Sequence, residues 1–224
     1  MHMIKRIALT ATILAVLAAV AVPSYAAITV YKNGFSSKAD YASVTKQSGK
    51  KKKCKRTWRK KSALGVTTKG GKQNCALKTP VESDSIRADL TVQVEAKMTE
   101  STEKAARKGA YLGVSLRSSR KEGYVFRVFP KTKKWELVKN RVIVQKGDDK
   151  AVKGMKKKNK LEISARGDTV VGKVNGKKQV SYKDPAPDEV EGLGTGLVYG
   201  ISQKVKKKKA VAFFDKLKVG VPKP

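Results

Sequence analysis

Short apolar segments alternate with polar residues along most of this chain, and turn-forming residues separate the segments. Such alternation is typical of half-buried β-strands, and no stretch keeps a helical period for long. The pattern predicts an all-β protein, in which the stretch 100–108 is short and polar enough to be a loop. The expected strands are 28–31, 55–58, 63–67, 74–78, 86–98, 110–117, 123–129, 135–139, 141–145, 160–165, 169–174, 177–182, 196–202 and 210–219.

Two hairpin turns are well marked, by Arg-Gly-Asp at 166–168 and by Asn175-Gly176. Asn-Gly is the strongest short-range hairpin signal because both residues tolerate positive φ. Residues 160–182 are therefore expected to form a three-stranded meander. Arg-Gly-Asp also spells an adhesion tripeptide, but its position in a turn explains it structurally.

The first 26 residues have the pattern of a secretory signal peptide. Lys5 and Arg6 form a positive start, an apolar stretch follows over 7–22, and small residues lead to a cleavage site after Ala26. A retained membrane anchor is the alternative, but the apolar run is shorter than the roughly 20 residues that a spanning helix needs. We expect a secreted, extracytoplasmic chain with no transmembrane segment after cleavage and a single domain over 27–224.

Cys54 and Cys75 are the only cysteines. An even number of cysteines in an exported chain predicts a disulfide, with two free buried thiols as the alternative. The closed loop would contribute about 3 kcal/mol on the chain-entropy estimate. The spacing does not fit a redox-active C-x-x-C motif.

The formal net charge is +33, and removal of the leader leaves it at +31. The chain has 41 lysines but 10 arginines, which favours diffuse attraction to polyanions over shape-specific recognition. Charge runs are often solvated turns, so a polyanion-binding role competes with that interpretation. Nucleic acid is a possible non-specific partner, although no recognition helix or RNA-binding aromatic motif accompanies the charge. The candidate polyanion-binding residues are Lys51, Lys52, Lys53, Lys157, Lys207 and Lys208.

Several segments in one order resemble the concanavalin A-like lectin/glucanase superfamily. They are 124–128 (YVFRV), 135–137 (WEL), 159–168 (NKLEISARGD), 174–176 (VNG), the glycine-rich 192–200 and 211–217 (VAFFDKL). The chain is most similar to bacterial branches related to laminin G-like and 3-keto-disaccharide hydrolase-like domains. This resemblance implies an antiparallel two-sheet jelly-roll sandwich, with its first and last strands paired and a concave face able to hold carbohydrate.

Period-two positions in these segments can fill the interior of such a sandwich. Asn159 and Asp215 are polar exceptions, which we interpret as turn or bulge residues that bind backbone. The expected core residues are Phe126, Val128, Leu137, Val142, Val144, Leu161, Ile163, Val170, Val174, Val211, Phe213 and Leu217.

Aromatic and arginine side chains on the expected strands are candidates for a sugar site. Sugar rings stack on aromatic faces, and arginines hydrogen-bond hydroxyl or acidic groups. Core packing is the more frequent use of an aromatic residue on a strand. The candidate ligand-binding residues are Tyr111, Arg117, Tyr124, Arg127 and Trp135, with Trp58 as a further aromatic candidate.

Enzymatic chemistry has weaker support in the sequence. His2 is the only histidine and is lost with the leader, which excludes Ser-His and Cys-His catalysis and ordinary zinc sites. The superfamily's hydrolases carry E-x-D-x-x-E, but the one E-x-D here, 82–84, is followed by Arg87 at the last position. A divergent hydrolase or lyase could instead recruit Glu95, Glu136 or Glu162 into one cleft.

Calcium is a possible cofactor, since acidic residues cluster at 148–149 and 184–191 without EF-hand spacing; otherwise no cofactor is expected. The sequence as a whole predicts a secreted, basic, non-catalytic module that binds an anionic glycan or cell-wall polymer. The alternatives are a glycoside hydrolase or lyase of the same superfamily and a non-specific binder of polyanions such as nucleic acid.

Overall fold

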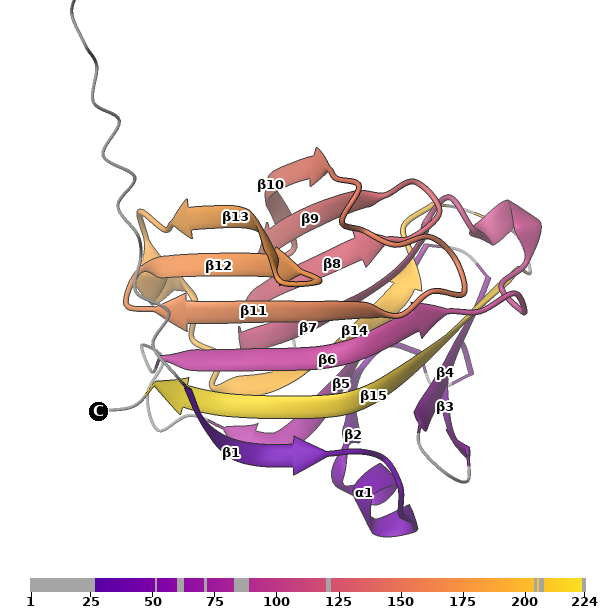
Figure 1. The fold of residues 1–224 in the computed structure, drawn as a ribbon, viewed down its shortest axis with the longest axis horizontal. Coiled ribbons are helices and arrows are strands. Elements are labelled where there is room, and N and C mark those ends of the chain that lie inside the picture. The colour runs from indigo at the N-terminus through magenta and orange to yellow at the C-terminus, as the bar shows by residue number, and fades with distance from the viewer. Residues whose placement is uncertain are drawn as a thin grey trace, which may run out of the picture.

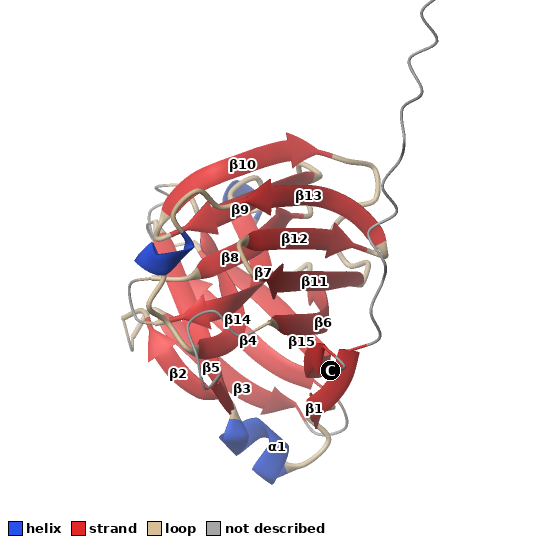
Figure 2. Cartoon of the chain, turned by 90° about the vertical axis from the view of Figure 1, so that its left-hand side faces the viewer, coloured by secondary structure: helices blue, strands red, loops and turns tan. Residues whose placement is uncertain are grey.

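Two antiparallel β-sheets, stacked face to face, make up the fold (Figure 1). A computed structural model of the chain describes residues 27–50, 52–59, 63–70, 72–82, 89–119, 122–203, 205 and 208–222. The two layers are seen edge-on from one end in Figure 2. The expected all-β, two-sheet jelly-roll architecture is confirmed.

Sheet A has eight strands, in the order β13-β12-β11-β6-β15-β4-β3, and β1 also pairs with β15. The first and last strands are therefore paired, as the resemblance implied. The strands are β1 (Ala27–Asn33), β3 (Cys54–Arg59), β4 (Ala63–Lys69), β6 (Leu90–Met98), β11 (Asn159–Arg166), β12 (Thr169–Val174), β13 (Lys177–Lys183) and β15 (Lys209–Pro222).

Sheet B has seven strands, in the order β10-β9-β8-β7-β14-β5-β2. The strands are β2 (Thr45–Ser48), β5 (Gln73–Glu82), β7 (Ala110–Ser118), β8 (Tyr124–Phe129), β9 (Lys134–Lys139), β10 (Val142–Asp148) and β14 (Gly194–Ile201). Neighbouring strands in each sheet are antiparallel. Some neighbours, such as β8 and β9, follow one another in the chain, whereas others, such as β7 and β14 or β6 and β15, are far apart in it.

The helices are short: α1 (Lys38–Ser43) and the 3₁₀ turns η1 (Lys104–Ala106) and η2 (Pro187–Glu189). None of the helices among the described residues has the length and apolarity that crossing a membrane requires. The sequence did not predict α1 or β2. Ser37 caps α1 by accepting a hydrogen bond from the Asp40 backbone N–H, while the Asp40 carboxylate accepts from the backbone of Ser37.

Both hairpin predictions are confirmed. Gly167 and Asp168 join β11 to β12, and Asn175 and Gly176, both at positive φ, join β12 to β13. Asn159 is fully buried and binds backbone, since its side chain accepts from Lys153 N and donates to Lys153 O. The interpretation of Asn159 as a backbone-binding turn residue therefore holds.

The core lies between the sheets and includes most of the expected side chains. Three expectations were wrong. Val142 is 65% exposed because it lies on the edge strand β10, and Val211 and Phe213 are only half-buried. On β15 the residues Ala210, Ala212 and Phe214 face inward instead, and a bulge that follows Asp215 resets the alternation so that Leu217 also faces inward. Val144 packs against the core but is only partly buried.

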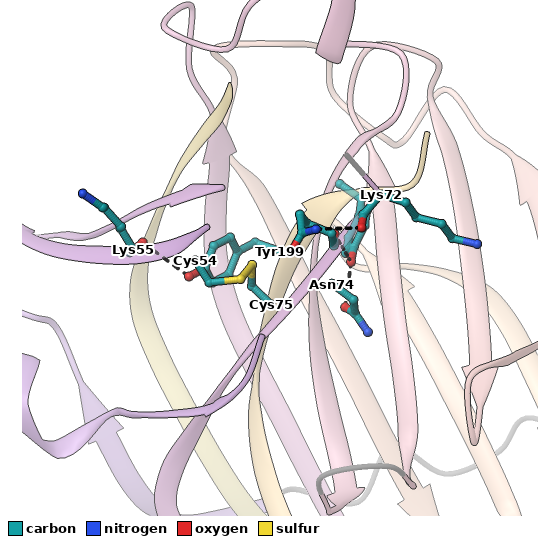
Figure 3. The surroundings of a disulfide bond; sticks show 8 residues. Cys54, Lys55, Lys72, Asn74, Cys75 and Tyr199 are labelled. Atoms are coloured by element: carbon teal, nitrogen blue, oxygen red, sulfur yellow. Dashed lines mark hydrogen bonds between the residues drawn. A yellow bond between two sulfur atoms is a disulfide. The ribbon is translucent and has the colours of Figure 1, made fainter. Parts of the chain in front are cut away.

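The disulfide between Cys54 and Cys75 is confirmed, with 5.8 Å between the Cα atoms. It joins β3 of sheet A to β5 of sheet B, as Figure 3 shows. Beside it, the Tyr199 hydroxyl donates to the Lys55 carbonyl over 3.3 Å, so a hydrogen bond also crosses between the sheets at this point. The disulfide thereby fixes the loop 49–53 next to the start of β5.

Candidate functional site

The face of sheet B that points away from sheet A carries its own apolar cluster, separate from the main core. Tyr111, Phe129 and Val198 are at most 4% exposed, and Ala76 and Val125 pack against them. Tyr111 pairs with Gly200 across β7 and β14, and the small residue Gly113 pairs with Arg127 across β7 and β8. The two glycines thus leave room for the large side chains of Tyr111 and Arg127 to lie along this face.

Arg127 lies over this cluster. Its guanidinium carbon is 4.7 Å from the centroid of the Tyr111 ring and 5.7 Å from that of Phe129, within cation–π range. Glu136, the cross-strand neighbour of Arg127 on β9, accepts from its Nε at 2.7 Å and contacts its Nη2 at 2.6 Å. We call Tyr111, Arg127, Phe129 and Glu136 the Tyr111–Arg127 site. The Arg127 and Glu136 side chains remain 16% and 17% exposed, so solvent reaches this ion pair.

The Tyr111 hydroxyl is anchored at the start of β5. It donates to Asn74 Oδ1 over 2.7 Å, and Asn74 itself is exposed. Burial is the main cause of the raised pKa of Tyr111, which the positive charge of Arg127 only partly offsets. Tyr111 is therefore a neutral hydrogen-bonding group at ordinary pH.

The five candidate sugar-binding residues occupy three places rather than one. Tyr111 and Arg127 come together on the outer face of sheet B. Trp135 faces the core, where its ring centroid is 6.3 Å from that of Phe126. Arg117 and Tyr124 are fully buried near Asp184, at the end of the sandwich opposite the 49–53 loop. Trp58 is half-buried, and its indole N–H donates to the Phe35 carbonyl over 3.2 Å.

A buried polar cluster surrounds Asp184. Its carboxylate accepts from the Tyr124 hydroxyl and, at 2.9 Å, from Lys139 Nζ, which also donates to Glu189 over 2.9 Å. Burial opposes the ionised form of Asp184, but the hydrogen bonds from Lys139 and Tyr124 outweigh it and lower its pKa. Burial likewise acts to lower the pKa of Lys139, and its two carboxylate partners raise it. The cluster fastens the 184–193 loop to β8 and β9.

Of the candidate polyanion-binding lysines, Lys52, Lys157 and Lys208 are exposed and Lys53 is half-buried. Lys208 contacts Glu103 at 3.3 Å. Lys51 and Lys207 lie outside the described residues. The loops that hold the described four all lie at one end of the sandwich, on the right in Figure 1, where β6 ends.

The carboxylates considered for catalysis lie on opposite sides of the molecule. Glu95 contacts Lys158 and Lys216, each at 3.0 Å, and Glu162 contacts Lys173 at 2.9 Å. Both carboxylates are on the outer face of sheet A, whereas Glu136 is on the outer face of sheet B. Beyond Glu82, the E-x-D stretch and Arg87 lie outside the described residues.

The acidic clusters considered for calcium are held by other side chains. Asp149 contacts Lys177 at 2.8 Å and accepts from the Ala151 backbone at 2.6 Å, and Asp184 and Glu189 share Lys139. These contacts together lower the pKa of Asp149, the hydrogen bond from Lys177 most. In the described part of the chain, no three acidic, histidine or cysteine side chains are grouped closely enough to hold a metal ion.

No sequence profile of a protein family matches the chain, and no curated protein matches it. Several solved structures, however, match the chain in fold. A CBM66 carbohydrate-binding module from Bacillus subtilis matches 80% of this chain and 95% of its own, with 16% identity and a TM-score of 0.56. A Bacillus subtilis protein of unknown function with a galectin-like fold matches 89% of this chain and all of its own, with 11% identity and a TM-score of 0.62.

An alginate lyase of family 7, A1-II', matches 72% of this chain and 78% of its own, with 10% identity and a TM-score of 0.52. These likenesses show the fold alone. They support the two-sheet jelly-roll sandwich, whereas the concanavalin A-like superfamily and its laminin G-like branch remain predictions.

Sequence reasoning missed Glu136 as the partner of Arg127, and missed Phe129 and Asn74 altogether. The signal was present in the alternation. On β8, Val125, Arg127 and Phe129 share one face, and Glu136 faces the same way on the neighbouring strand β9. The same alternation puts Tyr124 and Arg127 on opposite faces, so they could not have formed one site.

Proposed function

We propose that this protein is an extracytoplasmic, non-catalytic binding module for an acidic glycan, and that the glycan binds at the Tyr111–Arg127 site. The observation that carries the proposal is the placement of Arg127. Glu136 holds its guanidinium group over the rings of Tyr111 and Phe129, on a sheet face that points away from the sandwich interior.

The site matches the chemistry of an acidic sugar. Glu136 contacts Nε and Nη2 of Arg127, and a guanidinium group has five N–H donors, so the group has donors beyond this ion pair to offer to a ligand carboxylate. Asn74 is exposed beside the Tyr111 hydroxyl and offers amide groups to sugar hydroxyls. Lys134, which pairs with Phe129 across β8 and β9, is exposed and adds a positive charge on the same face.

The structural neighbours support the same ligand class. One is a carbohydrate-binding module and another is a lyase named for alginate, a polysaccharide whose units carry carboxylates. The leader sequence and the disulfide are both typical of exported proteins, which meet such polymers outside the cytoplasm. We propose that the module needs no cofactor, so that a chelator leaves binding unchanged.

Binding is favoured over turnover because the site lacks an available base. Tyr111 has a raised pKa and so stays protonated, and Glu136 is already engaged by Arg127. A lyase or hydrolase is the second candidate, favoured by one observation: a tyrosine and a carboxylate share this face. Slow depolymerisation of the bound polysaccharide would support that candidate instead.

Isothermal titration calorimetry with alginate oligosaccharides and with a neutral mannan oligosaccharide tests the proposal. We expect the wild type to bind the acidic ligand in preference, and Arg127→Met to weaken that binding by about tenfold or more, equivalent to about 1.4 kcal/mol. Lys178→Met is the matched control, since Lys178 is exposed on β13 of the other sheet. Equal affinities of the two variants would overturn the proposal.

A further inference from the structure

The fold gathers lysine-rich loops that are far apart in the sequence. The described residues of the loops 49–53, 70–72, 99–109, 130–133, 149–158 and 202–208 all lie at the end of the sandwich where β6, β8 and β10 finish. We call them the basic end. We propose that the basic end is a second contact surface for a long acidic polysaccharide, one that attracts the polymer by charge alone. The identity of the polymer rests on the proposed function.

Backbone hydrogen bonds fasten these loops to one another. Lys69, the last residue of β4, donates to the Lys53 carbonyl over 2.9 Å, and Gly70 donates to the Lys208 carbonyl over 2.6 Å. On the other side, Asp149 donates to the Lys133 carbonyl over 3.0 Å. Two lysine runs that the sequence separates by about 150 residues are thus joined through the connection from β4 to β5, and the disulfide ties β5 to β3 beside it. The lysines therefore form one surface.

Positive charge dominates this surface. Among the described residues of these loops, the acidic side chains are Glu100, Glu103 and Asp149, and each contacts a lysine: Lys156, Lys208 and Lys177 respectively. Many further lysines remain, so the local field is strongly positive. The exposed lysines of these loops are Lys50, Lys52, Lys72, Lys104, Lys108, Lys131, Lys133, Lys150, Lys153, Lys156, Lys157, Lys158 and Lys208.

At the opposite end, the charged residues of the described loops are mostly acidic. In the described part of its loops, Arg141 is the one basic residue. The acidic residues there are Asp89, Glu122, Asp168, Asp184, Asp188, Glu189 and Glu191. A body with this asymmetry approaches an anionic polymer with its basic end first.

The basic end carries mostly lysines rather than arginines, which favours a flexible acidic chain over a nucleic acid whose phosphates are bound at fixed positions. Lysine is a hydrated point charge, whereas bidentate contacts need arginine. The one described arginine in the basic-end loops, Arg107, already donates to the carbonyls of Thr102 and Glu100, at 3.0 and 3.3 Å. The affinity of the basic end should therefore depend on the charge density of the ligand and only weakly on the ligand's geometry.

The basic end also adjoins the Tyr111–Arg127 site. The loop 130–133 begins directly after Phe129, and the loop 70–72 ends just before Gln73 and Asn74. A polymer seated at Arg127 would thus pass between two lysine-bearing loops. Short oligosaccharides would use the Tyr111–Arg127 site alone, and long chains would use both surfaces.

The test compares two fourfold variants with the same change in net charge. One replaces Lys52, Lys72, Lys131 and Lys157 with Gln at the basic end. The control replaces Lys32, Lys38, Lys178 and Lys218 with Gln; these are exposed on other parts of the molecule. Affinity for long-chain alginate, for a short alginate oligosaccharide and for duplex DNA is measured over a range of salt concentrations.

We expect the basic-end variant to lose affinity for long alginate at least fivefold more than the control at low salt. Its salt dependence should also be shallower, while its binding of the short oligosaccharide stays at the wild-type level. Equal losses in both variants would overturn the inference, because net charge alone would then explain the attraction. Tighter binding of DNA than of alginate at matched salt would overturn the choice of polymer. Loss of short-ligand binding in Arg127→Met concerns the Tyr111–Arg127 site only, so the two proposals fail separately.

Discussion

Lys139 Nζ lies 2.9 Å from Asp184 Oδ1, and the two side chains are 9% and 0% exposed. Lys139 is the last residue of β9, and Asp184 follows β13 on the other sheet. The pair therefore ties the two sheets together at the end opposite the basic end. Tyr124, the first residue of β8, donates its hydroxyl to the same carboxylate.

Asp184→Asn should destabilise the protein by about 3 kcal/mol, because it leaves Lys139 with one carboxylate partner in a largely buried setting. Tyr124→Phe removes a single hydrogen bond and should cost about 1 kcal/mol. Urea unfolding followed by circular dichroism measures both. If the two variants lost equally little stability, the Lys139–Asp184 pair would not be what fastens the 184–193 loop.

The same pair predicts acid sensitivity. Since the pKa of Asp184 is below its usual 3.8 in the folded state, the unfolded chain takes up this proton more readily. The stabilisation is fully present above about pH 5 and is lost as the pH falls through the lowered folded pKa. The stability difference between wild type and Asp184→Asn should therefore shrink as the pH falls below the ordinary aspartate value of 3.8, as pH-dependent urea midpoints would show. A constant difference down to the lowest pH would contradict this assignment.

Removal of the Cys54–Cys75 disulfide should lower stability by about 3 kcal/mol, given its separation of 21 residues. The double variant Cys54→Ser, Cys75→Ser and reduction of the wild type should give similar losses in urea unfolding. A loss in long-chain polysaccharide binding should accompany them, since the disulfide anchors the loop 49–53. Unchanged stability after reduction would show that the other contacts of β3 suffice.

Gly200→Ala should damage the Tyr111–Arg127 site. A Cβ at this position would collide with the Gln73 carbonyl and the Tyr111 hydroxyl, and would lie 2.7 Å from Tyr111 Cζ. We expect a loss of about 1–3 kcal/mol in stability, together with displacement of the Tyr111 ring and weaker ligand binding. Gly34→Ala is the control, because a Cβ there meets nothing within 4 Å.

The sequence predicted most strands because period-two alternation and Gly-containing turns are local signals. β2 and α1 were missed because Thr45–Ser48 contains no apolar residue and the six-residue α1 is too short to show a helical period. The errors on β15 came from the bulge after Asp215, which shifts the alternation by an amount that only the pairing with β6 reveals. Local pattern does not encode such register shifts.

Part of the Tyr111–Arg127 site could be predicted from the sequence. Tyr111 and Arg127 were both identified, but alternation does not say which face of a strand lies inside the sandwich. Arg117 was grouped with Tyr111, and an unbroken strand would place both on one face. A shift in the β7–β14 pairing and a positive φ of 45° at Arg117 break that relation and bury its side chain. The clustering of lysine runs likewise depends on topology, which sends alternate loops to the same end.

Chemical-shift mapping by NMR with a short alginate oligosaccharide tests the central claim most directly. The account predicts the largest changes at Tyr111, at the Arg127 side-chain Nε–H and at Asn74, with smaller changes at Val198. Residues on the outer face of sheet A, such as Glu95 and Lys97, should not move. Changes confined to sheet A, or spread evenly over exposed lysines with none at Arg127, would contradict a glycan site on sheet B.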